Sequence, residues 1–495
     1  MFNTLTRMGA SGAATSYSID KSLRFNAFDD AYISYKPSTT GNQKVWTWSG
    51  WVKRTEIGVY THLLTCDMHS GEHNNGIAQL AFDSSDKLYT YFDTSGSNPY
   101  GAVNDAVFRD VASWYHIVWQ VDAANTDQRI WVNGVELACN SGQDPPDYDY
   151  AMNKADHLMA MGASAWDGVT GHSDLLLAEV HYIDGTKYQA SDFGETNEDT
   201  GQWVPKEVDG ITYGTNGCYL PFTGDALKNS FTDSSGDART VTPVGEAHHS
   251  TAQKKIGSSS IYFDGSFDAI GVPDHSDFDF GTGDFTIECW VRRSRQDADE
   301  WFFMHSDGTG AGSAAGLHIW STQYGGSNAN KAHFRLRMGG SSIDCNGTTT
   351  LATNTWYHIA GVRDGNTARI YVDGVQEASV SISGSLDTSD AAFAIGAIRA
   401  SGVGAGSDGL QGYIDEPRLS NNCRYPNGTT FTPSTTAFSS DANTLILVHS
   451  DFSGTDLAAD SSGTGNDWTA HNMSVTAGVG NDSFNDTPSN NWCTL

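Results

Sequence analysis

The residues of this sequence best placed for chemistry are carboxylates that fall close together on predicted strands. Glu179, His181 and Asp184 occupy one six-residue run, and Asp415 and Glu416 are adjacent in another. Glycoside hydrolysis needs two carboxylates that face one cleft, as acid and as nucleophile or base. Because alternate strand residues share a face, Glu179 and His181 point together, Asp184 points away, and Asp415 and Glu416 point apart. The pattern therefore indicates that the protein is not an enzyme.

Two histidines, His116 and His358, each follow a Trp-Tyr pair in similar surroundings. A catalytic or metal-binding role would need carboxylate or histidine partners at the same spacing in both places, and no such partner recurs. We therefore expect both imidazoles to be hydrogen-bonded within a sheet.

Two tryptophans, Trp51 and Trp290, interrupt strand faces that are otherwise polar. An indole in such a place can form a stacking platform for a sugar ring. Alternatively, a loop or the segment after the first domain folds over that face and buries it. We favour the second interpretation, because both tryptophans have neighbours typical of packed interiors.

The regions that follow these strands, residues 60–75 and 301–312, contain aromatic and histidine side chains that suit ligand contact on loops. A further predicted loop covers residues 325–330. The predicted ligand-binding residues are Tyr60, His69, His73, Trp301, His305, Trp320 and Tyr324.

The elements that would position these residues occur twice. Trp46–Arg54 and Phe285–Arg293 both alternate between apolar and polar residues and both end in two basic residues. Trp114–Ile117 and Trp356–Ile359 follow them, and the matched landmarks lie 238 to 242 residues apart. Several landmarks in one order at nearly one spacing indicate a duplicated domain.

Each copy also contains a hairpin signal, Asn133-Gly134 and Asp373-Gly374, between two apolar runs. Both positions of such a turn need positive φ, which these residue types tolerate. Together with the alternating strands and the lack of a helical period, this predicts an all-β fold of antiparallel sandwiches. The residues predicted to be buried are Trp46, Trp48, Val52, Phe285, Ile287 and Val291.

The chain has 495 residues, of which 53 are glycine, and this suits many short strands joined by turns. The predicted organisation is an N-terminal arm at 1–20, a first sandwich at 21–186, a packed connector at 187–222, a second sandwich at 223–450 and a Gly/Asn/Asp-rich tail at 451–495. The arm is either disordered or an extended segment that docks on a partner.

The net charge is −31, with 28 basic and 59 acidic residues, and it argues against nucleic acid or an anionic membrane as a partner. The seven cysteines show no metal-binding spacing, which indicates free thiols in a reducing compartment. The sequence begins without a signal peptide, and no apolar run approaches the ~18 residues of a membrane span. We expect a protein that is made in the cytoplasm and is not exported by a cleaved signal.

Both repeats resemble laminin-G-like domains of the concanavalin A-like lectin/glucanase superfamily, on the strand, Trp-Tyr-His-Ile and hairpin motifs above. The resemblance implies two tandem jelly-roll sandwiches with an irregular connector and tail, and lectin-like carbohydrate binding. Relatives of this kind often hold one Ca²⁺ through rim carboxylates, so Ca²⁺ is the cofactor to consider, although its site is not placed. The candidate rim acids are Asp83, Asp86, Asp167, Asp307, Asp344 and Asp408.

The connector resembles virion and tail-fibre-like proteins of bacteriophages, marine ones especially. The carrying segments are Asp192–Glu195, Trp203–Lys206, Tyr213–Leu220 and Asp460–Trp468, together with the Trp46–Arg54 strand. In such relatives the third segment runs soon into the fourth, so the second sandwich resembles an insertion. The resemblance implies a virion protein, as tail fibre, head fibre or capsid decoration, whose partners are other virion proteins and a host-surface glycan.

The alternatives are a carbohydrate-active enzyme and a free bacterial lectin or adhesin. A phage fibre would be a homotrimer, with contacts through apolar residues of the connector and tail, namely Trp203, Tyr213, Tyr219, Trp468 and Trp492. We expect the arm and the first sandwich with its connector to face the particle and the second sandwich to face the host. Alternatively, both sandwiches are spacers and a region beyond Leu495 meets the host.

Overall fold

The structure is a computed structural model in which the chain forms two compact units. The first unit comprises Met1–Leu227 and Gly454–Leu495, and the second comprises Lys228–Ser453, so the second is inserted into the first. The structure describes residues 17–66, 76–94, 101, 103–138, 144–165, 169–245, 247–265, 268–296, 298–306, 317–321, 329–397, 409–428, 430–459, 461–464, 466–475 and 482–489.

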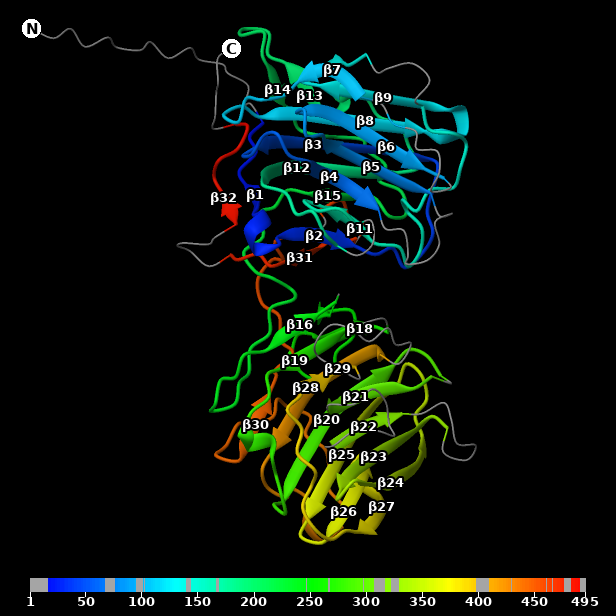
Figure 1. Cartoon of the computed structure of the whole chain (residues 1–495), viewed down its shortest axis with the longest axis vertical. Helices are drawn as coiled ribbons and strands as arrows, with labels where there is room; N and C mark the ends of the chain where they lie inside the picture. Colours follow the sequence, from blue (N-terminus) through cyan, green and yellow to red (C-terminus); the bar gives the residue numbers. More distant parts are fainter. Residues whose placement is uncertain are drawn as a thin grey trace, which may run out of the picture. The chain divides into compact units, whose positions relative to one another are not determined.

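The first unit contains two large antiparallel sheets, and Figure 1 shows β3, β8 and β12 side by side in one of them. In spatial order this sheet consists of β10 (Val135–Glu136), β9 (Asp127–Val132), β8 (Tyr115–Asp122), β3 (Val45–Arg54), β12 (Leu175–Asp184), β1 (Ser22–Phe25) and β32 (Ser483–Phe484), with β15 (Cys218–Leu220) also on β12. The other consists of β31 (Thr469–His471), β2 (Tyr32–Tyr35), β11 (Met159–Met161), β4 (Thr61–Cys66), β5 (Ile77–Phe82), β6 (Lys87–Asp93) and β7 (Val103–Val107).

The second unit repeats this plan. One sheet consists of β17 (His248–Ser250), β18 (Ser260–Asp264), β29 (Gln411–Ser420), β20 (Phe285–Arg293), β25 (Trp356–Asp364), β26 (Thr367–Val372) and β27 (Val375–Ser381), with β30 (Thr444–Leu447) also on β29. The other consists of β16 (Thr242–Val244), β19 (Ala269–Val272), β28 (Phe393–Ile395), β21 (Glu300–His305), β22 (Leu317–Ser321), β23 (Lys331–Met338) and β24 (Ser341–Thr350).

In the residues that the structure describes, helix is confined to single turns. They are η1 (Ala27–Asp29), η2 (Ala123–Asn125), α1 (Ala190–Phe193), η3 (Ser276–Phe278) and η5 (Pro426–Gly428). None of the helices in the described part of the chain is long and apolar enough to span a membrane.

The alternation of each central strand explains the sandwich, because one side chain in two must be removed from water. The six residues predicted as core are all buried, none more than 1% exposed. They lie in two separate apolar clusters, one within each unit. The prediction of an all-β fold with two tandem sandwiches is therefore confirmed.

The hairpin prediction is also confirmed in both copies. Asn133 and Asp373 have φ of 49° and 50°, and the following Gly134 and Gly374 both have φ of 78°. At Gly134 a Cβ would lie 2.4 Å from the Trp203 ring, so glycine is needed for packing as well as for the turn.

The connector and tail form part of the first unit. The connector contributes α1, β15 and a hairpin of β13 (Gly194–Thr196) and β14 (Trp203–Pro205). The tail, expected to be irregular, supplies β31 and β32, which extend the two sheets next to β2 and β1. Trp468 is fully buried in the core of the first unit, so the idea that it forms a trimer contact is wrong; Trp492 lies outside the described residues.

The second unit enters and leaves the first through two adjacent segments. The Asp225 N–H donates to the Thr455 carbonyl at 2.8 Å, and the Leu457 N–H donates to the Ala226 carbonyl at 2.8 Å. Ala226 and Asp456 form a parallel bridge. The two segments of the first unit that lead into and out of the inserted unit are therefore hydrogen-bonded neighbours. Only a short distance separates the two chain ends that a linker would have to join.

We predict that a variant with residues 228–453 replaced by a short Gly-Ser linker still folds. The core of the first unit consists entirely of residues outside that range, and closing a short loop costs little entropy. Thermal unfolding followed by near-ultraviolet circular dichroism should show a single cooperative transition. A non-cooperative melt with no aromatic signal would contradict the prediction.

Candidate functional site

Each sandwich has two outer sheet faces, and in the first unit one of them is covered by the connector. Trp51 on this face is 4% exposed. The Trp203 indole N–H donates to Nδ1 of His116 at 3.0 Å, and the Ser49 hydroxyl lies 3.0 Å from Nε2 of the same ring. His116 is thus hydrogen-bonded inside the structure, and the covered interpretation of Trp51 holds over that of an open sugar platform.

The second unit covers the corresponding face with its own later segment. Glu288 accepts hydrogen bonds from Arg418 at 2.6 Å, from Nε2 of His358 at 3.1 Å and from the Tyr425 hydroxyl at 2.6 Å. Burial by itself raises the pKa of Glu288, but the His358 hydrogen bond and the Arg418 charge outweigh it and lower the pKa to about 2. Trp290 on this face is 5% exposed, so it too is covered.

The carboxylates with the best spacing for chemistry lie at matching bulges. Glu179 and Glu416 have φ of 50° and 51°, and the strand register shifts beside both of them. The Tyr219 hydroxyl donates to Glu179 at 2.8 Å, and His449 lies 2.9 Å from Glu416. Both glutamates are buried. Their hydrogen bonds connect the segments that cover the two outer faces to the sheets beneath them.

The remaining outer face of the first unit, on β4, β5 and β6, carries a group of aromatic rings. Tyr60 is 53% exposed, and its ring centroid lies 6.5 Å from that of Tyr89 and 6.4 Å from that of His62. Tyr91 follows at 6.1 Å from Tyr89. His62 is 8% exposed, and its Nδ1 has no hydrogen-bond partner among the described residues. We refer to Tyr60, His62, Tyr89 and Tyr91 as the tyrosine face.

The equivalent face of the second unit, on β21, β22 and β23, carries a different set of rings. Trp301 and Trp320 are paired across the strands with centroids 5.2 Å apart, and His333 stacks on Trp320 at 5.1 Å. The Arg335 guanidinium lies 5.1 Å from the centroid of Trp320. Both ring nitrogens of His318 are buried without a partner in the described structure. We refer to these five residues as the tryptophan face.

The register shows that the two faces occupy the same place in the fold. The pairs His62–Ala81 and Trp301–Trp320 both precede a bulge. On the next strands, Ala81 pairs with Tyr89 as Trp320 pairs with His333. The next pairs whose side chains point away from the core are Gln79 with Tyr91 in the first unit and His318 with Arg335 in the second. The two units therefore carry different side chains at matching positions of the same sheet face.

The sequence placed Trp301 and His305 in a loop, and this placement is wrong; Trp320, a further candidate, also lies in a strand. Trp301 and His305 lie in β21 and Trp320 lies in β22, and they are 2%, 2% and 5% exposed. Strand pairing with a bulge, which a loop assignment ignores, turns Trp301 and Trp320 toward each other. His305 contacts Asp274 at 3.2 Å instead of joining them.

Of the other candidates, Tyr60 lies in the tyrosine face, whereas His69, His73 and Tyr324 lie outside the described residues. Sequence reasoning missed Tyr89, Tyr91, His318, His333 and Arg335. The signal that could have found the last two is the strict alternation of polar residues along β23 at 331, 333, 335 and 337.

The rim acids are engaged by protein groups. Asp86 pairs with Arg54 and Arg109, and Asp344 pairs with Arg335. Within the described ranges, no three His, Cys, Asp or Glu side chains are arranged to hold a metal ion. Asp167, Asp307 and Asp408 lie outside those ranges, so Ca²⁺ stays without an assigned site.

The chain matches the family model described as the concanavalin A-like lectin/glucanases superfamily over residues 28–190 and 264–427. These two matches cover more than half of the chain, and the chain therefore belongs to this laminin-G-type family. Membership supports a carbohydrate-binding module. No curated protein sequence matches the chain.

Solved structures with some likeness include domains LG4-5 of the mouse laminin alpha1 chain, with a TM-score of 0.26 and 12% identity over 86% of this chain and 100% of that one. Another is domain 4 of AbnA, a GH43 extracellular arabinanase from Geobacillus stearothermophilus in complex with arabinotriose, with a TM-score of 0.28 and 18% identity over 40% of this chain and 84% of that one. TM-scores this low do not support any inference about ligands.

The buried histidines predict that the first unit loses stability in mild acid. Burial, with a smaller effect of His181, lowers the pKa of His116 to about 3, and burial with His172 lowers that of His62 to about 4. Between these values and about 6.5 the unfolded chain binds protons that the folded chain does not, so stability falls as pH falls. For His116 the loss between about pH 6.5 and pH 4.5 is roughly 2–3 kcal/mol.

Thermal unfolding of the full chain at several pH values checks this. The first-unit transition should move to lower temperature as pH falls toward about 4.5, above the range where Glu288 is protonated. The variant His116→Gln should show a flatter pH dependence. If the melting temperature of this variant falls with pH as steeply as that of the wild type, His116 is not the cause of the acid sensitivity.

Proposed function

We propose that the protein is a non-enzymatic structural component of a bacteriophage particle that binds glycans through its sandwiches. The observation that carries the glycan part is the tyrosine face, a set of rings on an outer sheet face that the connector leaves uncovered. Tyrosine combines an apolar ring, which stacks on the C–H face of a sugar, with a hydroxyl that hydrogen-bonds. The unpartnered Nδ1 of His62 adds a hydrogen-bonding group beside the rings.

The absence of enzymatic activity is part of this proposal. The glutamates that a glycosidase would need, Glu179 and Glu416, are buried at strand bulges. They accept hydrogen bonds from Tyr219 and His449 of the covering segments. A hydrolase would instead need two carboxylates that flank one open cleft. A carbohydrate-active enzyme is thus the weaker candidate.

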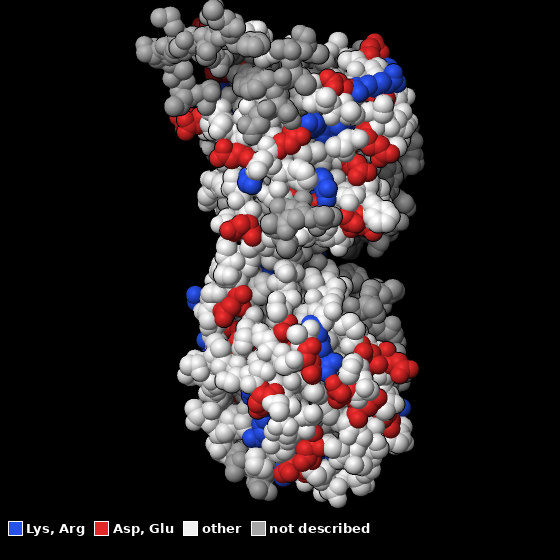
Figure 2. Space-filling model, turned by 90° about the vertical axis from the view of Figure 1, so that its left-hand side faces the viewer, with Lys and Arg blue, Asp and Glu red and all other residues white. Residues whose placement is uncertain are grey.

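The phage part rests on the connector and tail segments and on the composition. These segments resemble those of virion proteins, and the strongly acidic composition suits a soluble particle component that does not bind nucleic acid. Figure 2 shows Asp and Glu side chains spread over the displayed surface with Lys and Arg between them. In this proposal the other partners are virion proteins, and a homotrimer is the expected assembly.

The first test of glycan binding uses Tyr60→Ala and Tyr89→Ala in the full chain. Loss of one stacking ring should weaken binding about tenfold, or ~1.4 kcal/mol. A glycan array followed by calorimetry on the best neutral glycan measures the effect. The control is Tyr413→Ala, a half-buried surface tyrosine on the other sheet of the second unit. Equal losses in all three variants would remove the tyrosine face from the proposal.

The phage part predicts that this chain is present in purified particles. Peptide mass spectrometry of virions should detect it at a copy number that is a multiple of three. Its absence from particles would contradict the structural role. Release of reducing ends from algal or bacterial polysaccharide would favour the enzyme instead.

A further inference from the structure

We propose that one loop end of the first sandwich is the contact between copies of this chain. The inference rests on the proposed function, because it names the surface through which the expected homo-oligomer would form. The starting observation is a group of large aliphatic side chains exposed to solvent: Ile57 is 45% exposed, Val59 36%, Val107 45% and Val111 43%. Clusters of this kind on a protein surface mark interaction sites. We refer to these four residues as the aliphatic patch.

The loops that carry the patch are fixed on one buried carboxylate, that of Asp86. The Gly58 N–H donates to its Oδ1 at 2.6 Å, and Nε of Arg109 donates to its Oδ2 at 2.6 Å. Arg54, which is fully buried, donates to Asp86 at 3.1 Å and to the Phe108 carbonyl at 2.7 Å. The loop before β4 and the loop after β7 are therefore held together, and a surface that is already ordered loses little entropy on association.

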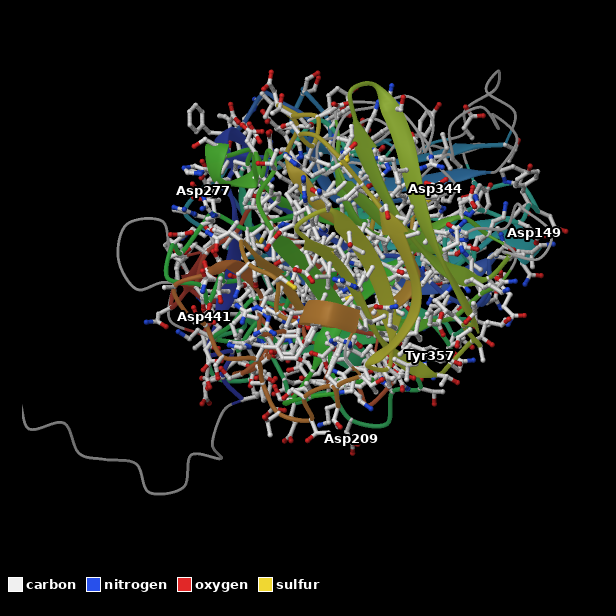
Figure 3. All side chains as sticks on the ribbon, turned by 90° about the horizontal axis from the view of Figure 1, so that it is seen from below. Asp149, Asp209, Asp277, Asp344, Tyr357 and Asp441 are labelled. Atoms are coloured by element: carbon white, nitrogen blue, oxygen red, sulfur yellow. The ribbon has the colours of Figure 1, made fainter. Side chains whose placement is uncertain are left out.

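The second unit builds the same frame at the equivalent end of its sandwich. Arg293 donates to the Leu351 carbonyl at 3.4 Å, which is the bond that Arg54 makes in the first unit. The loop that follows is held by Tyr357, labelled in Figure 3, whose hydroxyl accepts the Ala352 N–H at 3.2 Å. The two units can therefore be compared position by position.

The side chains on this shared frame are polar in the second unit where they are aliphatic in the first. The loops after β3 and β20 both have six residues, and Gln296 stands where Ile57 stands. At the strand end beside the loops, Thr350 occupies the register position of Val107. The same frame thus forms without an aliphatic surface, so the fold does not require the patch.

The charges around the patch favour a second copy of this chain as the partner. Residues 53–60, 83–87 and 105–111 contain four basic and five acidic side chains, whereas the whole chain has 28 and 59. Contact here therefore brings together less like charge than the average surface of the chain would. A contact between identical surfaces must also be self-complementary. The patch meets this condition, because Glu56 and Asp110 are exposed and the Arg109 side chain is 62% exposed.

Sedimentation equilibrium of the purified full chain over a range of concentrations tests the inference. The wild type should associate, and salt should strengthen the association by screening the repulsion between chains of net charge −31. The double variant Val59→Glu/Val111→Glu should weaken association at least about tenfold, because it places carboxylates in an apolar contact. The control is Val375→Glu, at a valine of the second unit that is 51% exposed, and it should associate like the wild type.

Thermal unfolding of each variant should match that of the wild type, since all three positions are exposed. A wild-type chain that stays monomeric at every concentration would overturn the inference. So would unchanged association in the double variant, or an equal loss in the control.

The outcomes for the proposed function are distinct. If the chain associates through the patch but is absent from purified particles, the phage role fails and this inference stands. If the chain is present in particles and the double variant associates like the wild type, this inference fails and the phage role stands.

Discussion

The constraint on which the structure depends is that each sandwich must hide one outer face of its own sheets. Trp51 with His116, and Trp290 with Glu288 and His358, cannot remain in water or in an unpaired interior without a large cost in free energy. Each unit meets this constraint with a segment that follows its last long strand, β12 or β29. The connector and its counterpart in the second unit are therefore structural parts of the sandwiches.

The other outer faces differ in exposure: Tyr60 on the β4–β6 face is 53% exposed, whereas Trp301 and Trp320 on the β21–β23 face are buried. The β4–β6 and β21–β23 faces carry different side chains at matching register positions, whereas the covered faces share a histidine and a tryptophan that pair across matching strands. Tyr91 and Arg335, for example, occupy the same register position in the two units.

Much of the fold could be predicted from the sequence, because alternation and turn chemistry are local. The central strands, both hairpins and the six core residues follow from periods of two and from Asn-Gly and Asp-Gly pairs. The candidate site was harder to predict from the sequence. The bulge after Trp301 reverses which neighbours share a face, and nothing local in the sequence shows where it falls. The cross-strand pairing of His318 with Arg335 also depends on a register that only the folded sheet defines.

The insertion of the second unit bears on how the chain divides its tasks. Residues 454–489 return to the first unit and supply strands to both of its sheets, so that unit is complete only when the chain has passed through the second. Asp486 accepts hydrogen bonds from Lys53 and Trp114, and the Ser22 hydroxyl donates to its carbonyl. The described segments nearest the two ends of the chain are thus tied to one unit. An inserted unit bounded by two adjacent crossings can be removed or exchanged without a change in the strand order of the first unit.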